Sequence, residues 1–97
     1  MEARVITAQI EPGKIDEAIG IYRDSVVPAV KEKQGFKGAF LLTDPNSDRG
    51  ISVTLWETEA DMKAGETSNY LREQIAKFAA VLLGPPVVEH YDVSVQV

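Results

Sequence analysis

The chain has 97 residues, a hydrophobic fraction of 44% and a formal charge of −5. This length predicts a single domain, residues 1–97, and the hydrophobic fraction is that of a folded globular protein. The acidic balance argues against a nucleic acid or an anionic membrane as a partner, because both are bound by basic faces. Since cysteines, a membrane-length apolar run and the layout of a secretion signal are all missing, we expect a cytoplasmic protein.

The first part of the chain predicts a strand followed by a helix. Residues 4–10 are rich in β-branched side chains and end at turn residues, as strands do. Over residues 14–34 the apolar positions recur at steps of three and four, which indicates a helix with one buried stripe. Because Pro28 lacks a backbone donor, we expect a kink or a break there, and Gly35 would then close the helix in a left-handed conformation.

The rest of the chain predicts a hairpin, a split helix and a last strand. The period falls to two over residues 36–43 and 50–57, which flank a polar loop and indicate a β-hairpin. A short helix begins after Thr58, which resembles a capping residue, and a second helix follows Ser68. A Gly-Pro-Pro run ends that helix, and residues 87–97 alternate as a final strand.

The predicted order β-α-β-β-α-β is that of the ferredoxin-like α+β fold, a four-stranded antiparallel sheet with helices on one face. Successive side chains of a strand point to opposite faces, so Ile51, Val53 and Leu55 lie opposite the face that carries Trp56. Two helices can cover only one face of the sheet. The other, aliphatic face predicts pairing with a second copy, and hence a homodimer.

Two stretches, "GFKG" (35–38) and "TLWETEADM" (54–62), resemble the antibiotic biosynthesis monooxygenase domain family, together with the proline-containing helix before them. The likeness runs from about Ile10 to Ala64. The resemblance implies a dimeric α+β barrel, in which the tryptophan face of the 50–57 strand lines a pocket between helices and sheet. It does not select a reaction, because the superfamily includes cofactor-free quinone-forming monooxygenases, haem-degrading enzymes and members of no known activity.

Several residues are candidates for such a site. The catalytic candidates are Trp56 as a pocket wall, Tyr70 as a hydrogen-bond or proton partner, and His90, the one histidine. Each has a structural alternative: Trp56 could pack with its indole N–H bonded to the backbone, the tyrosines could belong to the core, and His90 has no clustered carboxylate partner. The candidates for binding a substrate are Tyr22, Thr7, Thr54, Phe78 and Arg72. Among these, Arg72 would bind a negative charge on the substrate.

The resemblance argues against haem. The haem-degrading relatives carry an asparagine in the first strand and an iron-binding histidine shortly after the tryptophan. Here the first strand, "VITAQI" (5–10), has no asparagine, and "AGETSN" (64–69) has no histidine. His90 lies on the last strand, which is a different element. Because no cluster of metal-binding residues is recognisable either, we expect neither a metal nor another cofactor.

Two functions remain. The first is a cofactor-independent monooxygenase acting on a small aromatic, such as a hydroquinone or a polyketide-like phenol, in a pocket between helices and sheet. Such a substrate supplies its own electrons to oxygen once it is deprotonated, so the protein needs only to bind it, desolvate it and stabilise the anion. The alternative is a non-catalytic dimeric module of the same fold that binds a small ligand or supports an assembly.

Overall fold

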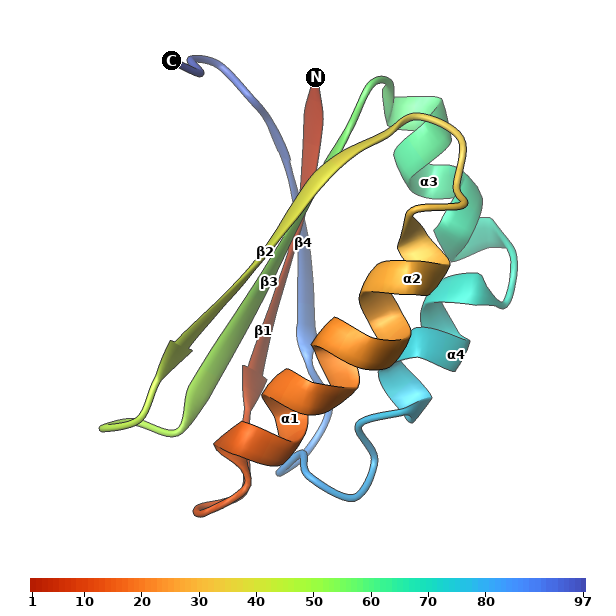
Figure 1. The fold of residues 1–97 in the computed structure, drawn as a ribbon. Coiled ribbons are helices and arrows are strands. Elements are labelled where there is room, and N and C mark those ends of the chain that lie inside the picture. The colour runs from red at the N-terminus through yellow and green to blue at the C-terminus, as the bar shows by residue number, and fades with distance from the viewer.

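The computed structural model describes residues 1–97 as a four-stranded antiparallel sheet, in the order β2-β3-β1-β4, with all helices on one face (Figure 1). The predicted ferredoxin-like α+β fold is therefore confirmed. The elements, in chain order, are β1 (Glu2–Gln9), α1 (Ile15–Ile21), the π-helical turn η1 (Tyr22–Val26), α2 (Val27–Val30), β2 (Phe36–Asp44), β3 (Arg49–Trp56), α3 (Glu59–Thr67), α4 (Tyr70–Ala76) and β4 (Val87–Asp92). None of the helices is both long and apolar enough to cross a membrane.

The expected disturbance at Pro28 takes the form of the π-helical turn η1, placed directly before it. The backbone N–H of Val27 donates to the carbonyl of Tyr22, five residues earlier. A proline cannot donate to the preceding turn and its ring crowds the carbonyl four residues back, and a wider turn relieves that crowding. The chain therefore continues as a helix through the proline instead of breaking.

The first helix ends at Val30, four residues before the predicted end. Beyond it, the bonds from Glu32 to Ala29 and from Lys33 to Val30 span only three residues, as in a tight final turn. The last predicted residues are polar and have no apolar stripe to bury, so packing does not hold them in a longer helix. Gly35 adopts the predicted left-handed conformation, with φ of 79°.

The second helix and the last strand are also shorter than predicted. After α4 the chain turns inward, which brings the fully buried Val81 against Ile10 and lets Leu82 form a β-bridge with Ile10. Strand β4 ends at Asp92 because that residue pairs with Glu2, the first residue of β1. Beyond this pair the backbone N–H of Val93 donates to the carbonyl of Met1 at 2.9 Å, and residues 93–97 do not continue the strand.

Two small clusters of buried side chains hold the helices on the sheet, one at each end of β1. Ile10, Ala18 and Val81 form the first. Val30, Trp56 and Met62 form the second, which we call the tryptophan cluster. Phe36 packs against the tryptophan cluster, and its ring meets Trp56 edge-on at 5.8 Å between centroids.

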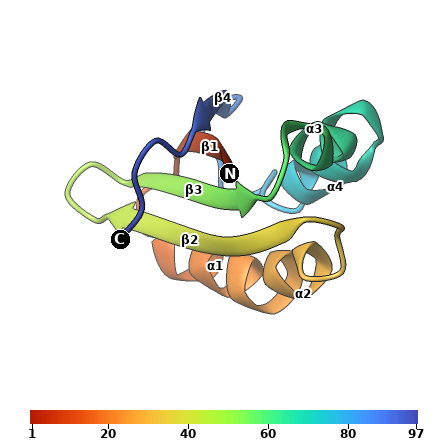
Figure 2. The same ribbon diagram turned by 90° about the horizontal axis from the view of Figure 1, so that it is seen from above.

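The sheet face away from the helices remains uncovered by the chain itself. Figure 2 shows the molecule from above, with α1 and α2 below β2, α3 and α4 to the right of β3, and no helix on the opposite side of the sheet. The pairs Phe40–Val53 and Leu42–Ile51 lie on the open face, next to residues of β1 and β4. Four large apolar side chains of this face are more than half exposed. They are Phe40, Leu42, Val87 and Tyr91.

Candidate functional site

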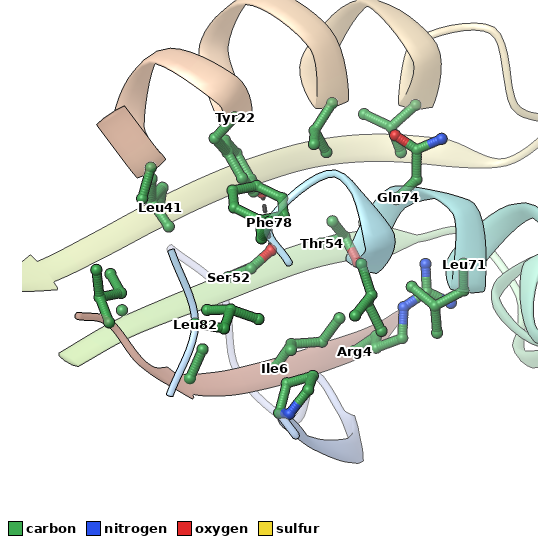
Figure 3. A pocket seen from close by; sticks show the side chains of 18 of the residues that line it. Arg4, Ile6, Tyr22, Leu41, Ser52, Thr54, Leu71, Gln74, Phe78 and Leu82 are labelled. Carbon is green, nitrogen blue, oxygen red and sulfur yellow. Dashed lines mark hydrogen bonds between the residues drawn. The ribbon is translucent and has the colours of Figure 1, made fainter. Parts of the chain in front are cut away.

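A cavity of about 90 Å³ lies between the helices and the sheet, between the two buried clusters (Figure 3). Strands β1, β2 and β3 form its floor, and the first helix, α4 and the segment after α4 form its walls. Thirteen of its nineteen lining residues are hydrophobic, so the cavity suits an apolar or aromatic guest. Its polar groups come from six residues: Arg4, Tyr22, Ser52, Thr54, Tyr70 and Gln74.

Tyr22 is the first residue of the π-helical turn, and its side chain lines the cavity. Its hydroxyl lies 2.9 Å from the hydroxyl of Ser52 on β3 and 3.5 Å from the carbonyl of Phe40. Burial raises the pKa of the Tyr22 phenol above its ordinary value, against the smaller opposing effects of the Ser52 hydrogen bond and the Arg4 charge. Tyr22 is therefore a neutral hydrogen-bond donor at physiological pH, and not a phenolate base.

Arg4 is a buried cation at one end of the cavity, 2% exposed, on the inward face of β1. Its Nη1 donates to the carbonyl of Met62 at 2.9 Å and to the Glu66 carboxylate at 3.2 Å. The guanidinium also lies 5.3 Å from the centre of the Trp56 ring, within the range of a cation–π contact. These contacts make the burial of a charge tolerable, but the Nε of Arg4 has no hydrogen-bond partner in the protein.

Tyr70 is the first residue of α4 and lines the same cavity. Its hydroxyl is buried and has no partner in the protein. Burial raises the pKa of the Tyr70 phenol, and the positive charge of Arg4 opposes that shift. Like Tyr22, Tyr70 is a neutral donor, but its hydroxyl is unoccupied whereas that of Tyr22 is bonded to Ser52.

His90 lies beside Arg4 in the register of β1 and β4, but not in the cavity lining. Its Nε2 is 2.9 Å from both carboxylate oxygens of Glu66, and its side chain is 38% exposed. The expectation that His90 has no carboxylate partner is therefore wrong. Glu66 is on α3, far from His90 in the sequence, and only the packing of α3 on the sheet brings the two together.

Trp56 belongs to the tryptophan cluster and does not line the cavity. It is 1% exposed, and its indole N–H donates to the Thr54 hydroxyl at 2.9 Å. The predicted alternative of a packing residue with a satisfied indole describes this environment, although the acceptor is a side chain and not the backbone. Outside the cluster, Trp56 borders a second, mostly polar depression near Lys33 and Asp61.

No family model matches the chain. Among curated proteins, the uncharacterized protein Rv2558 of Mycobacterium tuberculosis is 36% identical over 93 residues. The match covers 95% of this chain but 38% of that protein, so the chain spans well under half the length of its relative.

Solved structures are similar over nearly the whole chain. A monooxygenase from Streptomyces coelicolor, in complex with the ligand nanaomycin D, has a TM-score of 0.78 and 20% identity, covering 99% of this chain and 89% of that one. The crystal structure of an antibiotic biosynthesis monooxygenase has a TM-score of 0.74 and 16% identity, covering 96% and 98%. The chain has the fold of the antibiotic biosynthesis monooxygenases.

Within this monooxygenase fold, the structure brings together only some of the predicted site residues. Four of them line the cavity: Tyr22, Thr54, Tyr70 and Phe78. Thr7 does not, because it pairs with Ile51 and Val87 on the open face of the sheet, and its neighbours Ile6 and Ala8 point inward instead. Arg72 is exposed and outside the lining.

Arg4, and not the expected Arg72, is the cation that lines the cavity. The strand pattern around Arg4 could have indicated this. Alternation along β1 puts Arg4 on the same face as Ile6, Ala8 and Ile10, and a charged residue on an otherwise apolar strand face is unusual. The position of Glu66 could not be recognised in the same way, because a glutamate among the polar residues of α3 is typical of a solvent-exposed helix.

Proposed function

We propose that the protein is a homodimeric, cofactor-independent monooxygenase that acts on a small aromatic, a hydroquinone or a polyketide-like phenol, in the cavity between helices and sheet. The observation that carries this proposal is an apolar cavity whose polar groups include a buried arginine and two neutral tyrosines. The cavity measures about 90 Å³, so a single-ring substrate fits with less rearrangement than a polycyclic one. The ligand complex of the Streptomyces coelicolor monooxygenase of the same fold supports the choice of a cavity ligand.

The reaction requires the protein to bind, desolvate and orient the substrate. A hydroquinone and O₂ give a hydroxyquinone and water: one oxygen atom enters a ring C–H bond, the two phenol O–H groups become quinone carbonyls, and the other oxygen leaves as water. The substrate supplies all four electrons. Tyr22 and Tyr70 can donate hydrogen bonds to its oxygens, and the Arg4 charge stabilises the phenolate that transfers the first electron to O₂.

The homodimer belongs to the proposal because the open sheet face is apolar. Phe40 and Leu42 on this face are more than half exposed, and Val53 lies between the two neighbouring strands. A second copy placed face to face would bury these side chains. Sedimentation should show a wild-type dimer at micromolar concentration, whereas Val53→Asp should give a monomeric or unfolded chain, since it buries an unpaired charge. A wild-type monomer would remove the dimer from the proposal.

A second candidate function is a non-catalytic ligand-binding module. The observation that favours it is the lining, which contains hydrogen-bond donors but neither a carboxylate nor an imidazole to remove a proton from the substrate. His90 and Glu66 lie just outside it and bond to each other. In this second function the same cavity holds the same class of ligand and releases it unchanged.

Oxygen consumption distinguishes the two functions. The assay presents a panel of hydroquinones and anthrone-like phenols without added flavin or metal. Ala8→Leu fills the cavity from β1, and Thr7→Val changes the neighbouring position that faces away, so it serves as the matched control. Turnover by the wild type and by Thr7→Val, with a loss in Ala8→Leu, supports the monooxygenase. Ligand-induced stabilisation without oxygen uptake supports the binding module, and the absence of both overturns both.

A further inference from the structure

Two donors in the cavity have no hydrogen-bond partner in the protein: the Nε of Arg4 and the hydroxyl of Tyr70. Buried polar atoms are nearly always satisfied in folded proteins, because an unmade hydrogen bond costs stability. Every other buried side-chain donor and acceptor of the chain has a partner. The unsatisfied atoms are thus confined to one place, and both of their residues line the cavity.

The side chains of Arg4 and Tyr70 both border Gly65. A Cβ built on Gly65 would lie 3.2 Å from Cδ2 of Tyr70 and 3.9 Å from Nη1 of Arg4, so the phenol ring and the guanidinium are both neighbours of this glycine. Figure 3 shows Arg4 beside Leu71 of α4 at one end of the cavity, away from Leu41 at the other end. This end of the cavity therefore presents a positive charge and a hydroxyl donor, next to an otherwise apolar wall.

We propose that the Nε of Arg4 and the hydroxyl of Tyr70 form a subsite for a negatively charged oxygen of the ligand, such as a phenolate or an enolate oxygen. This inference rests on the proposed binding of an aromatic in the cavity and assigns its orientation. The oxygen receives two hydrogen bonds at the β1–α4 end, and the ring extends along the apolar lining towards Phe78. An oxygen that accepts from two donors, one of them a cation, is stabilised as an anion, as in an oxyanion hole.

Two hydrogen bonds from Nη1 hold the guanidinium of Arg4 in place beside the proposed subsite. Glu66 accepts from Nη1 of Arg4 and is itself bonded by His90, so it anchors the guanidinium through that one nitrogen. The carbonyl of Met62 accepts from the same nitrogen. With Nη1 occupied, Nε is left for the ligand. Glu66, His90, Tyr22 and Tyr70 are the titratable groups around Arg4, and none of them supplies an acceptor for Nε.

The subsite and the apolar lining should change the pKa of a bound phenol in opposite directions. An apolar cavity favours the neutral form of a phenol and raises its pKa, because burial disfavours charge. Two donors, one of them a cation, favour the phenolate and lower the pKa of the phenol. The sign of the change on binding therefore reports whether Arg4 and Tyr70 contact the oxygen, independently of any turnover.

The experiment uses 4-nitrophenol, whose anion is yellow, with nitrobenzene as a probe that lacks the hydroxyl. Binding is followed by the fluorescence of Trp56, which lies beside Arg4, and ionisation by the absorbance of the anion. We expect wild-type protein to bind the phenolate and to lower the apparent pKa of 4-nitrophenol. Tyr70→Phe should weaken phenolate binding about tenfold, the equivalent of about 1.4 kcal/mol, without weakening nitrobenzene binding.

Controls separate the subsite from the cavity. Tyr91→Phe removes a hydroxyl that donates to Glu89 on the open sheet face, away from the cavity, and keeps the apolar ring there, so it should change the binding of neither probe. Arg4→Met should abolish the lowering of the apparent pKa of 4-nitrophenol. If that variant does not fold, Tyr70→Phe alone provides the test. Equal binding of both probes, with the ionisation of 4-nitrophenol unchanged or suppressed, overturns the subsite but leaves the proposed binding function standing. If neither probe binds, both are overturned.

Discussion

The tryptophan cluster and the cavity both lie between the helices and the sheet and share Val30, yet their buried polar groups differ: those of the cluster are hydrogen-bonded, and some of those in the cavity are not. In the cluster, the indole of Trp56 is bonded to Thr54 and the ring is enclosed by Val30 and Met62. In the cavity, the hydroxyl of Tyr70 is equally hidden from solvent but has no partner. We call the cluster the completed region, because its buried polar groups are hydrogen-bonded, and this favours stability. The cavity is the incomplete region, because its unpaired donors can bind a ligand but cost stability.

The largest effect should come from emptying the completed region. Trp56→Ala removes the largest buried side chain and leaves a cavity among Val30, Met62 and Phe36. We expect a loss of about 3–5 kcal/mol in the free energy of unfolding, measured by urea denaturation. A loss below about 1 kcal/mol would show that Trp56 is not a structural anchor, and would restore it as a candidate for the ligand site.

A smaller loss should follow from removing one hydrogen bond of the completed region. Thr54→Val keeps the shape of the side chain but leaves the indole N–H of Trp56 without its acceptor. The expected cost is about 1–3 kcal/mol, because the buried donor stays unsatisfied. Thr7→Val, on the open face of β1, makes the same chemical change outside the helix–sheet interface, and it should cost clearly less.

The two cavity tyrosines predict a loss of stability at alkaline pH. Burial raises the pKa of Tyr22 and of Tyr70 above 10.0 in the folded state, so the folded chain holds these protons more tightly than the unfolded chain does. Their contribution is fully present below pH 10 and declines as the pH rises through the raised values. Urea denaturation across this range should show a shallower decline in Tyr22→Phe than in the wild type; identical slopes would contradict the burial of the phenol.

The smallest effect on stability is expected in the incomplete region. Tyr70→Phe removes a hydroxyl that bonds to nothing in the protein, so the denaturation midpoint should stay within about 0.5 kcal/mol of wild type or rise. A loss comparable to that of Thr54→Val would mean that the hydroxyl contributes to the fold, and the contrast between the two regions would disappear.

Much of the fold could be predicted from local patterns. The periods of two and of three to four gave the order of the strands and helices, because each element buries one face. The ends of elements were less predictable. Strand β4 ends at Asp92, which pairs with the first residue of β1, and α4 ends where the chain turns inward to bury Val81. Both limits depend on a neighbour that is distant in the sequence.

The candidate site was predictable only in part, for a similar reason. Tyr22 and Thr54 could be assigned to the inner face by periodicity, and they line the cavity. Periodicity says nothing about which hydroxyls find partners. The contact of Glu66 with both Arg4 and His90, and the unsatisfied hydroxyl of Tyr70, arise from the packing of α3 and α4 on the sheet.

A crystal structure of the protein with 4-nitrophenol bound would test the central claim most directly. The account predicts the ring inside the cavity, with its phenolate oxygen about 3 Å from both the Nε of Arg4 and the hydroxyl of Tyr70. A ring bound in the polar depression beside Trp56, or one whose oxygen points away from Arg4 towards Phe78, would contradict it.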